Sequence, residues 1–228
     1  MKTESGRKLL AIKELGKMQQ VNVVIFDMDG TLYQLDGEEE GMFGSSLERG
    51  VLANSRQFIL EREGCSASKA EAIVEMGLQD SIGLSNFLVG RYGITRENYF
   101  NVVWNIDPEG IVRDFEEATE VVKELAGSGK KLILLTSAPK VWQEQVIKFL
   151  GLEKCFTEIY TGEDYGQKRE MFVKLSQRYD SDGILSIGDQ LVTDIQPAQE
   201  LGMETFLVNS PSDLKNLLLE KGGVYEQG

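Results

Sequence analysis

The sequence predicts an α/β fold in which a doubly wound parallel sheet carries a smaller helical domain inserted after its first strand. Five short runs are rich in apolar residues and do not alternate strictly with polar ones, as expected for parallel strands that are covered on both faces. Helical patterns separate the later runs, which indicates crossover connections. Between the first two runs, apolar residues recur at helical spacing and predict the insertion. The five runs are residues 21–26, 131–135, 156–160, 184–187 and 205–208.

The remaining elements follow in chain order. We expect an N-terminal extension over residues 1–20, with a short amphipathic helix on the helical spacing of its apolar residues. The α/β core comprises residues 21–37 and 109–228, and the helical insertion, residues 38–108, lies between these two parts. Glycines just beyond the periodic segments mark helix ends in the core. The core helices are expected over residues 115–126, 141–150, 171–179 and 194–201.

Composition and charge exclude several classes of function. The 228 residues carry a formal net charge of −13, which argues against binding nucleic acid or an anionic membrane by charge neutralisation. There is no histidine, so Ser-His-Asp and Cys-His catalysis and histidine-ligated zinc are excluded. The chemistry must depend on carboxylates, hydroxyls, lysines and a hard cation.

Cysteine content and hydropathy indicate where the protein works. Two cysteines are too few for a four-thiolate zinc site or a disulfide framework, and free thiols fit a reducing compartment. No apolar run reaches the roughly 18 residues that a membrane span requires. We therefore expect a cytoplasmic protein, a monomer or homodimer, without a nucleic-acid or membrane partner.

The strongest functional signal lies at the end of the first predicted strand. Asp27 and Asp29 stand two residues apart and are followed by Gly30. Ligands of open α/β sheets bind outside the carboxyl ends of the strands, so these acids emerge where chemistry is expected. The same pattern also serves as turn chemistry at a strand exit, and this segment alone leaves both interpretations open. A calcium loop of the EF-hand type is rejected, because Leu32 occupies the position that requires glycine.

A second pair of acids follows a later predicted strand. Asp189 comes directly after Gly188, and Asp194 follows where a helix begins, a position that also suits an ordinary helix-start acid. Two carboxylates about 4 Å apart repel by roughly 4 kcal/mol at an effective dielectric constant near 20. A cluster of Asp27, Asp29, Asp189 and Asp194 therefore needs a dication or shifted pKa values. All-oxygen ligands favour Mg²⁺.

Hydroxyls and cations lie between these two acidic segments. Thr136 and Ser137 end the strand predicted at 131–135 and are suited to hydrogen-bonding a phosphoryl oxygen; equally, they could cap the helix that follows. Lys168 and Arg169 open a later helix in an otherwise acidic chain, either as phosphate-site cations or as solvated surface charges.

Taken together, these segments resemble the four ordered motifs of the haloacid dehalogenase superfamily, in its phosphatase branch. The first motif is Asp27-Met-Asp-Gly-Thr-Leu, and Thr136, Lys168 and Asp189 with Asp194 match the other three. The resemblance extends from residue 21 to about residue 208. It implies a Rossmann-like core and places the family's smaller cap domain at the helical insertion.

The resemblance also implies roles for these residues. Asp27 would be the nucleophile that attacks phosphorus, and Asp29 the acid and base that serves the leaving oxygen. Thr136 and Lys168 would hold the phosphoryl group and Asp27. Magnesium would bind Asp27, the backbone carbonyl of Asp29 and Asp189, with Asp194 as a direct or outer ligand.

In the insertion, residues 92–95, Tyr99 and residues 104–108 resemble caps of the pyrimidine 5′-nucleotidase type, and the branch as a whole resembles nucleotidases and phosphoglycolate phosphatases. That group often carries a Gly-x-x-x-Arg-Gly-Leu-like stretch, and Asn86 stands where its arginine would fall. Asn86, Gly30 and Ser137 are the candidate substrate-binding residues. The proline that commonly follows the family's lysine is absent after Lys168. Arg169 is therefore the nearest alternative to Lys168 as the cation of the phosphate site.

These observations predict a Mg²⁺-dependent phosphomonoesterase that works through an aspartyl-phosphate intermediate. A cation makes a weak carboxylate nucleophile effective by neutralising developing charge. The expected substrate is a small phosphorylated metabolite, either a nucleoside monophosphate or a phosphoglycolate-like compound. The alternatives are a phosphomutase of the same fold and a non-catalytic metal-binding scaffold. A phospho-aspartate receiver is disfavoured, because it has no leaving alcohol for Asp29 to protonate.

Overall fold

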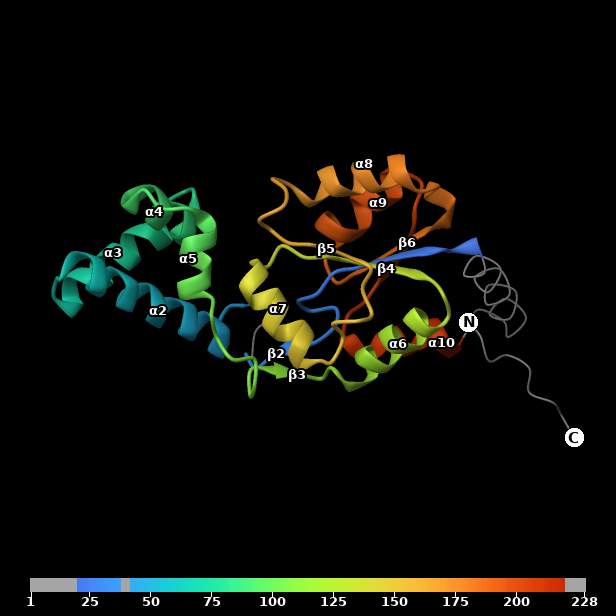
Figure 1. Cartoon of the computed structure of the whole chain (residues 1–228), viewed down its shortest axis with the longest axis horizontal. Coiled ribbons are helices and arrows are strands. Elements are labelled where there is room, and N and C mark those ends of the chain that lie inside the picture. The colour runs from blue at the N-terminus through green and yellow to red at the C-terminus, as the bar shows by residue number, and fades with distance from the viewer. Residues whose placement is uncertain (1–19, 38–41, 220–228) are drawn as a thin grey trace, which may run out of the picture.

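The computed structural model describes residues 20–37 and 42–219. The helix expected in the N-terminal extension lies outside these residues. Five parallel strands form one sheet in the order β5-β4-β1-β6-β7, which confirms the predicted doubly wound α/β fold (Figure 1). The strands are β1 (Val23–Phe26), β4 (Lys131–Leu135), β5 (Glu158–Tyr160), β6 (Ile184–Gly188) and β7 (Glu204–Leu207).

The position of β1 in the middle of the sheet brings distant segments to one edge. Phe26, the last residue of β1, is in register with Leu134 of β4 and Ile187 of β6. All three strands run in the same direction, so the residues that follow them emerge side by side. Asp27 and Asp189 therefore lie at the same carboxyl edge of the sheet.

Helices cover both faces of the sheet (Figure 1). Alternate strand residues point to opposite faces. Val23 and Ile25 pack in one buried cluster with residues of α8 and α9, whereas Val24 and Phe26 pack on the other side with α6 and α7. Each such buried side chain contributes roughly 1.5–3 kcal/mol. The core helices are α6 (Glu116–Gly127), α7 (Lys140–Phe149), α8 (Lys168–Arg178), α9 (Gln196–Glu200) and α10 (Asn216–Leu219), and the 3₁₀ turns are Ser181–Gly183 and Pro211–Lys215.

Two core helices differ from their predicted bounds by more than one residue at an end, whereas α6 and α7 differ by a single residue. α8 begins at Lys168 and not at residue 171, because its first turn is polar and carries no apolar periodicity. A π-helical turn, Leu191–Ile195, precedes α9, where a helix was expected from residue 194. The backbone N–H of Gln190 donates to the Asp194 side chain at 3.0 Å across this wide turn.

Four helices lie to one side of the sheet, at the left of Figure 1. We call them the helical region: α2 (Ser46–Glu63), α3 (Ala67–Gln79), α4 (Gly83–Tyr92) and α5 (Arg96–Val103). The side chains of Ser45, Ser66 and Thr95 accept the N-capping hydrogen bonds of α2, α3 and α5. Edge-to-face contacts of Phe58 with Tyr92 and Tyr99 join three of these helices. All four helices fall within residues 38–108, and the division into core and cap domains stays a prediction.

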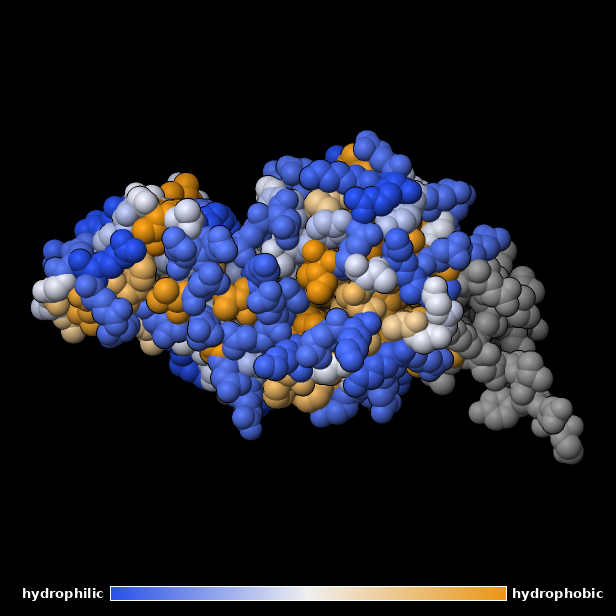
Figure 2. Space-filling model, viewed as in Figure 1, coloured by the Kyte–Doolittle hydropathy of each residue, from blue (hydrophilic) through white to orange (hydrophobic). Residues whose placement is uncertain are grey.

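A short antiparallel pair joins the helical region to the core. β2 (Gln34–Leu35) pairs with β3 (Val112–Arg113), so the chain leaves and re-enters the core through adjacent segments. Two-residue strands carry no periodic signal, and the sequence therefore did not indicate them. The surface is mostly hydrophilic and is hollowed between the helical region and the core (Figure 2). Within residues 20–37 and 42–219, no helix has the length and apolarity needed to cross a bilayer.

Candidate active site

Three of the four predicted metal-site acids converge at the carboxyl edge of the sheet. Asp27, Asp189 and Asp194 each offer one carboxylate oxygen, and these oxygens lie within 4.8 Å of one another. Asp27 follows β1, Asp189 follows β6, and Asp194 belongs to the π-helical turn. The hydroxyl of Thr31 lies 3.4 Å from both Asp27 Oδ2 and Asp189 Oδ1. The group is an all-oxygen cluster built from segments that are far apart in the chain.

A buried lysine contacts this cluster. Lys168 Nζ lies 2.6 Å from Asp27 Oδ1 and 2.7 Å from Asp194 Oδ1, and only 8% of its side chain is exposed. Burial alone would lower the pKa of Lys168, but the charges of Asp27 and Asp194 outweigh it and raise that pKa. Arg169 instead pairs with Glu200 at the exposed surface. The structure therefore places Lys168, and not Arg169, at the acidic cluster.

The remaining negative charge of the cluster favours a bound cation. Burial, followed by the charges of Asp27 and Asp194, raises the pKa of Asp189 to about 7. Burial and Asp27 likewise raise the pKa of Asp194, even though Lys168 opposes the shift. Hard, all-oxygen donors of this kind fit Mg²⁺, so Asp27, Asp189 and Asp194 form a suitable donor set.

The side chain of Asp29 has different partners. The Tyr33 hydroxyl donates to Asp29 Oδ1, and Trp142 Nε1 lies 3.3 Å from the same oxygen. Thr136 Oγ1 lies 3.4 Å from Oδ2. Burial raises the pKa of Asp29 although these donors act in the opposite direction. The carboxyl of Asp29 is thus set apart from the metal-binding group, while its predicted backbone contact with magnesium stays a prediction.

Tyr33 and Trp142 are contacts that the sequence analysis missed. Both side chains are fully buried, and Trp142 Nε1 lies 3.0 Å from the Tyr33 hydroxyl. Tyr33 follows Asp29 by four residues, a local signal that could have pointed to it. Trp142 lies on α7, far along the chain, and only the fold brings it to Asp29.

Two glycines are required where backbone and carboxylates approach closely. Gly30 has φ of 77°, and a Cβ there would lie 2.8 Å from Cγ of Asp189. A Cβ at Gly188 would lie 2.6 Å from Cγ of Asp194. Neither position admits a side chain without displacing an acid of the cluster.

The two predicted hydroxyl residues have separate surroundings. Thr136 is fully buried, and its Oγ1 accepts a hydrogen bond from the Ala138 N–H at 3.1 Å. The N-cap residue of α7 is Pro139, and no side chain caps that helix, so neither hydroxyl serves the capping role left open by the sequence. Ser137 lines a cavity next to the acids.

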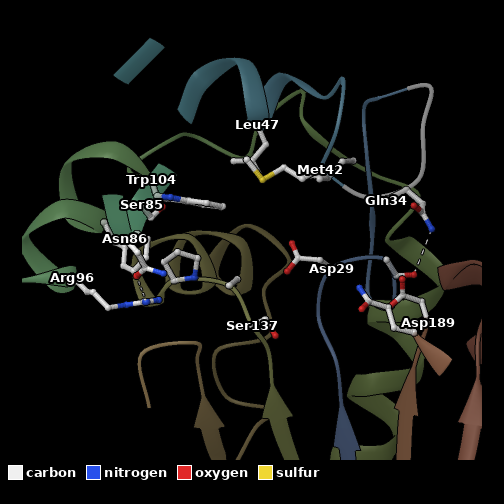
Figure 3. A pocket seen from close by; sticks show the side chains of 16 residues that line it. Asp29, Gln34, Met42, Leu47, Ser85, Asn86, Arg96, Trp104, Ser137 and Asp189 are labelled. Carbon is white, nitrogen blue, oxygen red and sulfur yellow. Dashed lines mark hydrogen bonds between the residues drawn. The ribbon is translucent and has the colours of Figure 1, made fainter. Parts of the chain in front are cut away.

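This cavity, about 350 Å³ in volume, lies between the core and the helical region. Figure 3 shows Asp29 and Asp189 on one side and Ser85, Asn86 and Arg96 on the other. All three predicted substrate-binding residues line it. The full lining is Asp29, Gly30, Gln34, Leu35, Met42, Leu47, Ser85, Asn86, Arg96, Phe100, Trp104, Ser137, Ala138, Pro139, Asp189 and Gln190.

Comparison with known proteins identifies the family. The model of the haloacid dehalogenase-like hydrolases matches residues 21–202. The chain belongs to this hydrolase family. Among curated proteins, it is 22% identical to glyceraldehyde 3-phosphate phosphatase of Methanocaldococcus jannaschii over 207 residues, which are 80% of this chain and 82% of the relative.

Solved structures share the fold of this family member. A phosphatase of the haloacid dehalogenase family from Thermococcus onnurineus is 20% identical, with a TM-score of 0.56 over 87% of this chain and 98% of its own. A putative β-phosphoglucomutase from Thermotoga maritima is also 20% identical, with a TM-score of 0.53 over 88% and 99%. At these identities the likeness shows the fold alone. The nucleotidase or phosphoglycolate phosphatase branch stays a prediction.

Proposed function

We propose that this hydrolase removes the phosphoryl group from a small phosphorylated metabolite through an aspartyl-phosphate intermediate. One observation supports the proposal above all others. Asp27 lies at the end of β1 within hydrogen-bonding distance of Lys168, in the same cluster as Asp189 and Asp194. A second carboxyl, Asp29, stands apart from that cluster and lines the neighbouring cavity.

Asp27 is the nucleophile in this proposal. A carboxylate oxygen of Asp27 forms a bond to phosphorus as the bond between phosphorus and the ester oxygen breaks. Lys168, held at 2.6 Å, fixes the orientation of the Asp27 carboxylate and balances part of the charge around it. The product of this step is an aspartyl-phosphate and the alcohol.

Asp29 moves the proton in both half-reactions. In its protonated form it gives a proton to the leaving oxygen, and as a carboxylate it then takes a proton from the water that attacks the aspartyl-phosphate. Burial raises the pKa of Asp29 and so favours the protonated form that the first step needs. Tyr33 and Trp142 hold the carboxyl in place.

We further propose Mg²⁺ as the cofactor, held by Asp27, Asp189 and Asp194. When bound there, it would neutralise negative charge that develops on the phosphoryl oxygens. The helical region would act as the cap, because it supplies the wall of the cavity opposite the acids. A cytoplasmic location and a monomeric or homodimeric state remain predictions from the sequence.

The proposal is tested by phosphate release from p-nitrophenyl phosphate. The wild type with Mg²⁺ should release phosphate, excess EDTA should stop the release, and added Mg²⁺ should restore it. Asp27→Asn should lose the activity while its circular dichroism spectrum stays that of the wild type. Turnover by a folded Asp27→Asn variant would remove Asp27 as the nucleophile. Isomer formation from a sugar phosphate without phosphate release would favour the mutase.

A further inference from the structure

The two ends of the cavity differ in charge. The end formed by the core carries Asp29 and Asp189, whereas the end formed by the helical region carries Arg96 (Figure 3). Of the described residues that line the cavity, Arg96 is the one basic residue. The chain has an excess of acidic residues, so a cation facing this space is not explained by general surface composition.

Among the described residues, Arg96 is held in place without an acidic partner. Its Nη1 donates to Asn86 Oδ1 at 2.8 Å, and the Asn86 amide donates to the carbonyl of Ile82 at 2.9 Å. The guanidinium also lies 5.1 Å from the centre of the Phe100 ring. No ion pair between described residues includes Arg96.

Two other arginines of the helical region are paired with acids, whereas Arg62, like Arg96, lies over an aromatic ring and is in no ion pair between described residues. Arg56 contacts Glu71, and Arg91 lies 2.9 Å from Glu63. A guanidinium has five N–H donors in a planar fork that matches a carboxylate or phosphate. The Arg96 fork uses one donor on Asn86 and keeps the rest of its donors and its charge for another acceptor.

A second polar group at this end has no hydrogen-bond partner in the described part of the chain. Trp104 Nε1 is the single buried side-chain nitrogen or oxygen among the described residues without a hydrogen bond. An unsatisfied buried donor is costly, but this nitrogen is itself buried and is not exposed to the cavity, so the argument for a ligand rests on Arg96. Trp104 lines the same cavity as Arg96.

We infer that the substrate carries a second acidic group, either a carboxylate or a second phosphate. Arg96 binds this group, and Asn86 orients the Arg96 side chain. This inference rests on the proposed function, because it assumes that the phosphate to be removed lies at Asp27. It narrows the substrate class to phosphomonoesters that are anionic at both ends. A nucleoside monophosphate, with an uncharged base at its far end, leaves the charge of Arg96 unpaired.

Matched pairs of substrates test this inference. We would compare kcat/KM for 3-phosphoglycerate with that for glycerol 1-phosphate. The first compound carries a carboxylate where the second carries an alcohol. The second pair, 1,3-propanediol bisphosphate and 3-hydroxypropyl phosphate, tests a distal phosphate. We expect the wild type to prefer the doubly anionic member of at least one pair by about tenfold or more, as for a charged hydrogen bond. Equal values within both pairs, or a higher value for uridine 5′-monophosphate, would overturn the inference.

Arginine variants assign the preference to a residue. Arg96→Gln should reduce the anionic-to-neutral ratio to about one, and Arg96→Lys should keep part of it. Arg62→Gln is the matched control. Arg62 is also exposed, lies in the helical region and stacks on an aromatic ring, Phe58, but does not line the cavity. A ratio unchanged in Arg96→Gln, or reduced equally in Arg62→Gln, contradicts the assignment.

p-Nitrophenyl phosphate separates this inference from the proposed function. Hydrolysis of this substrate together with equal rates within both pairs would overturn the distal-anion site and leave the phosphatase intact. Absence of phosphate release from every substrate would overturn both.

Discussion

The two ends of the cavity are built on different principles. The core end carries Asp29 and Asp189, and Asp189 belongs to the acidic cluster with Asp27. Asp27 and its partner Lys168 do not line the cavity; they are more than nine-tenths buried where parallel strands and a helix start meet. At the helical end, Asn86 and Arg96 are exposed and lie on the surfaces of α4 and α5. Buried charges must be paired, so a substitution at the core end affects both folding and chemistry. Exposed residues can change at little structural cost, which makes the helical end suited to selecting the substrate.

The largest effect should come from removing the buried cation of the core end. In the wild type, Lys168 Nζ lies 2.6 Å from Asp27 Oδ1 and 2.7 Å from Asp194 Oδ1. Lys168→Met leaves both carboxylates without this shared partner. We expect a loss of about 3–5 kcal/mol in the free energy of unfolding of the metal-free protein. Phosphatase activity should fall below detection. Urea unfolding in EDTA measures the first effect and phosphate release the second.

Arg169→Met is the matched control for this variant. It removes a cation from the next position of the same helix, but its ion pair with Glu200 is exposed on both sides. Exposed ion pairs contribute about 0–1 kcal/mol, so stability and turnover should remain close to those of the wild type. Equal losses in the two variants would contradict a special role for Lys168.

The next effect concerns the partners of Asp29. Tyr33→Phe removes one donor to its carboxyl and leaves Trp142 and Thr136. A positioned general acid contributes about 10²–10⁴-fold when the leaving group is a poor one. We therefore expect kcat for an alkyl phosphate to fall by at least about tenfold more than kcat for p-nitrophenyl phosphate, whose leaving group needs little protonation.

Tyr99→Phe provides the comparison. Tyr99 is also fully buried and its hydroxyl is hydrogen-bonded, to Ser55 at 3.1 Å, but it lies in the helical region. A general loss of packing would lower turnover of both substrates equally in either variant. That outcome for Tyr33→Phe would remove Tyr33 as a positioning residue of Asp29.

A smaller effect, on stability alone, follows from the raised pKa of Asp189. Its pKa is about 7 in the folded protein against an ordinary value of 3.8, so the folded state holds a proton that the unfolded state has lost between these pH values. The metal-free protein should therefore lose stability as the pH rises from about 4 to 7, and little more above that range. Mg²⁺ competes with this proton, so it should stabilise the protein more at pH 8 than at pH 5.

Thermal unfolding at both pH values, with EDTA or with Mg²⁺, measures this difference. At a Mg²⁺ concentration 100 times its Kd, the gain at pH 8 should be about 2.7 kcal/mol. Asp189→Asn resembles the protonated acid, so it should stabilise the metal-free protein at pH 8 and reduce the response to Mg²⁺. An equal Mg²⁺ response at pH 5 and pH 8 would argue against competition at this cluster.

The same contrast between the two ends explains how much the sequence could predict. β1 and β6 are buried at every position, and their mostly apolar sequences are a local signal that predicted both strands and the acids that follow them. The contact between Trp142 and Asp29 has no local signal, because it depends on how α7 packs. β2 and β3 are too short for a periodic pattern.

At the helical end, sequence reasoning selected Asn86 from a resemblance and missed Arg96. Arg96 begins α5, a position where a charged residue is ordinary. Only the arrangement of α4 and α5 brings its side chain to Asn86 and the cavity. Motifs at strand ends can therefore be predicted from the sequence. The residues of an exposed binding surface cannot, because they are brought together only by the packing of helices that are separate in the chain.

The smallest effect should come from Asn86, which acts through Arg96. Asn86→Ala removes the acceptor at 2.8 Å but leaves the guanidinium stacked on Phe100, so the cation stays near the cavity with more freedom. A single hydrogen bond contributes about 0.5–1.5 kcal/mol, which corresponds to a two- to tenfold loss in the preference for a doubly anionic substrate. The ratio of kcat/KM within each substrate pair measures this loss, with Gln57→Ala, at an exposed position of α2, as the control. A larger loss than in Arg96→Gln would mean that Asn86 binds the substrate directly and that Arg96 supports it.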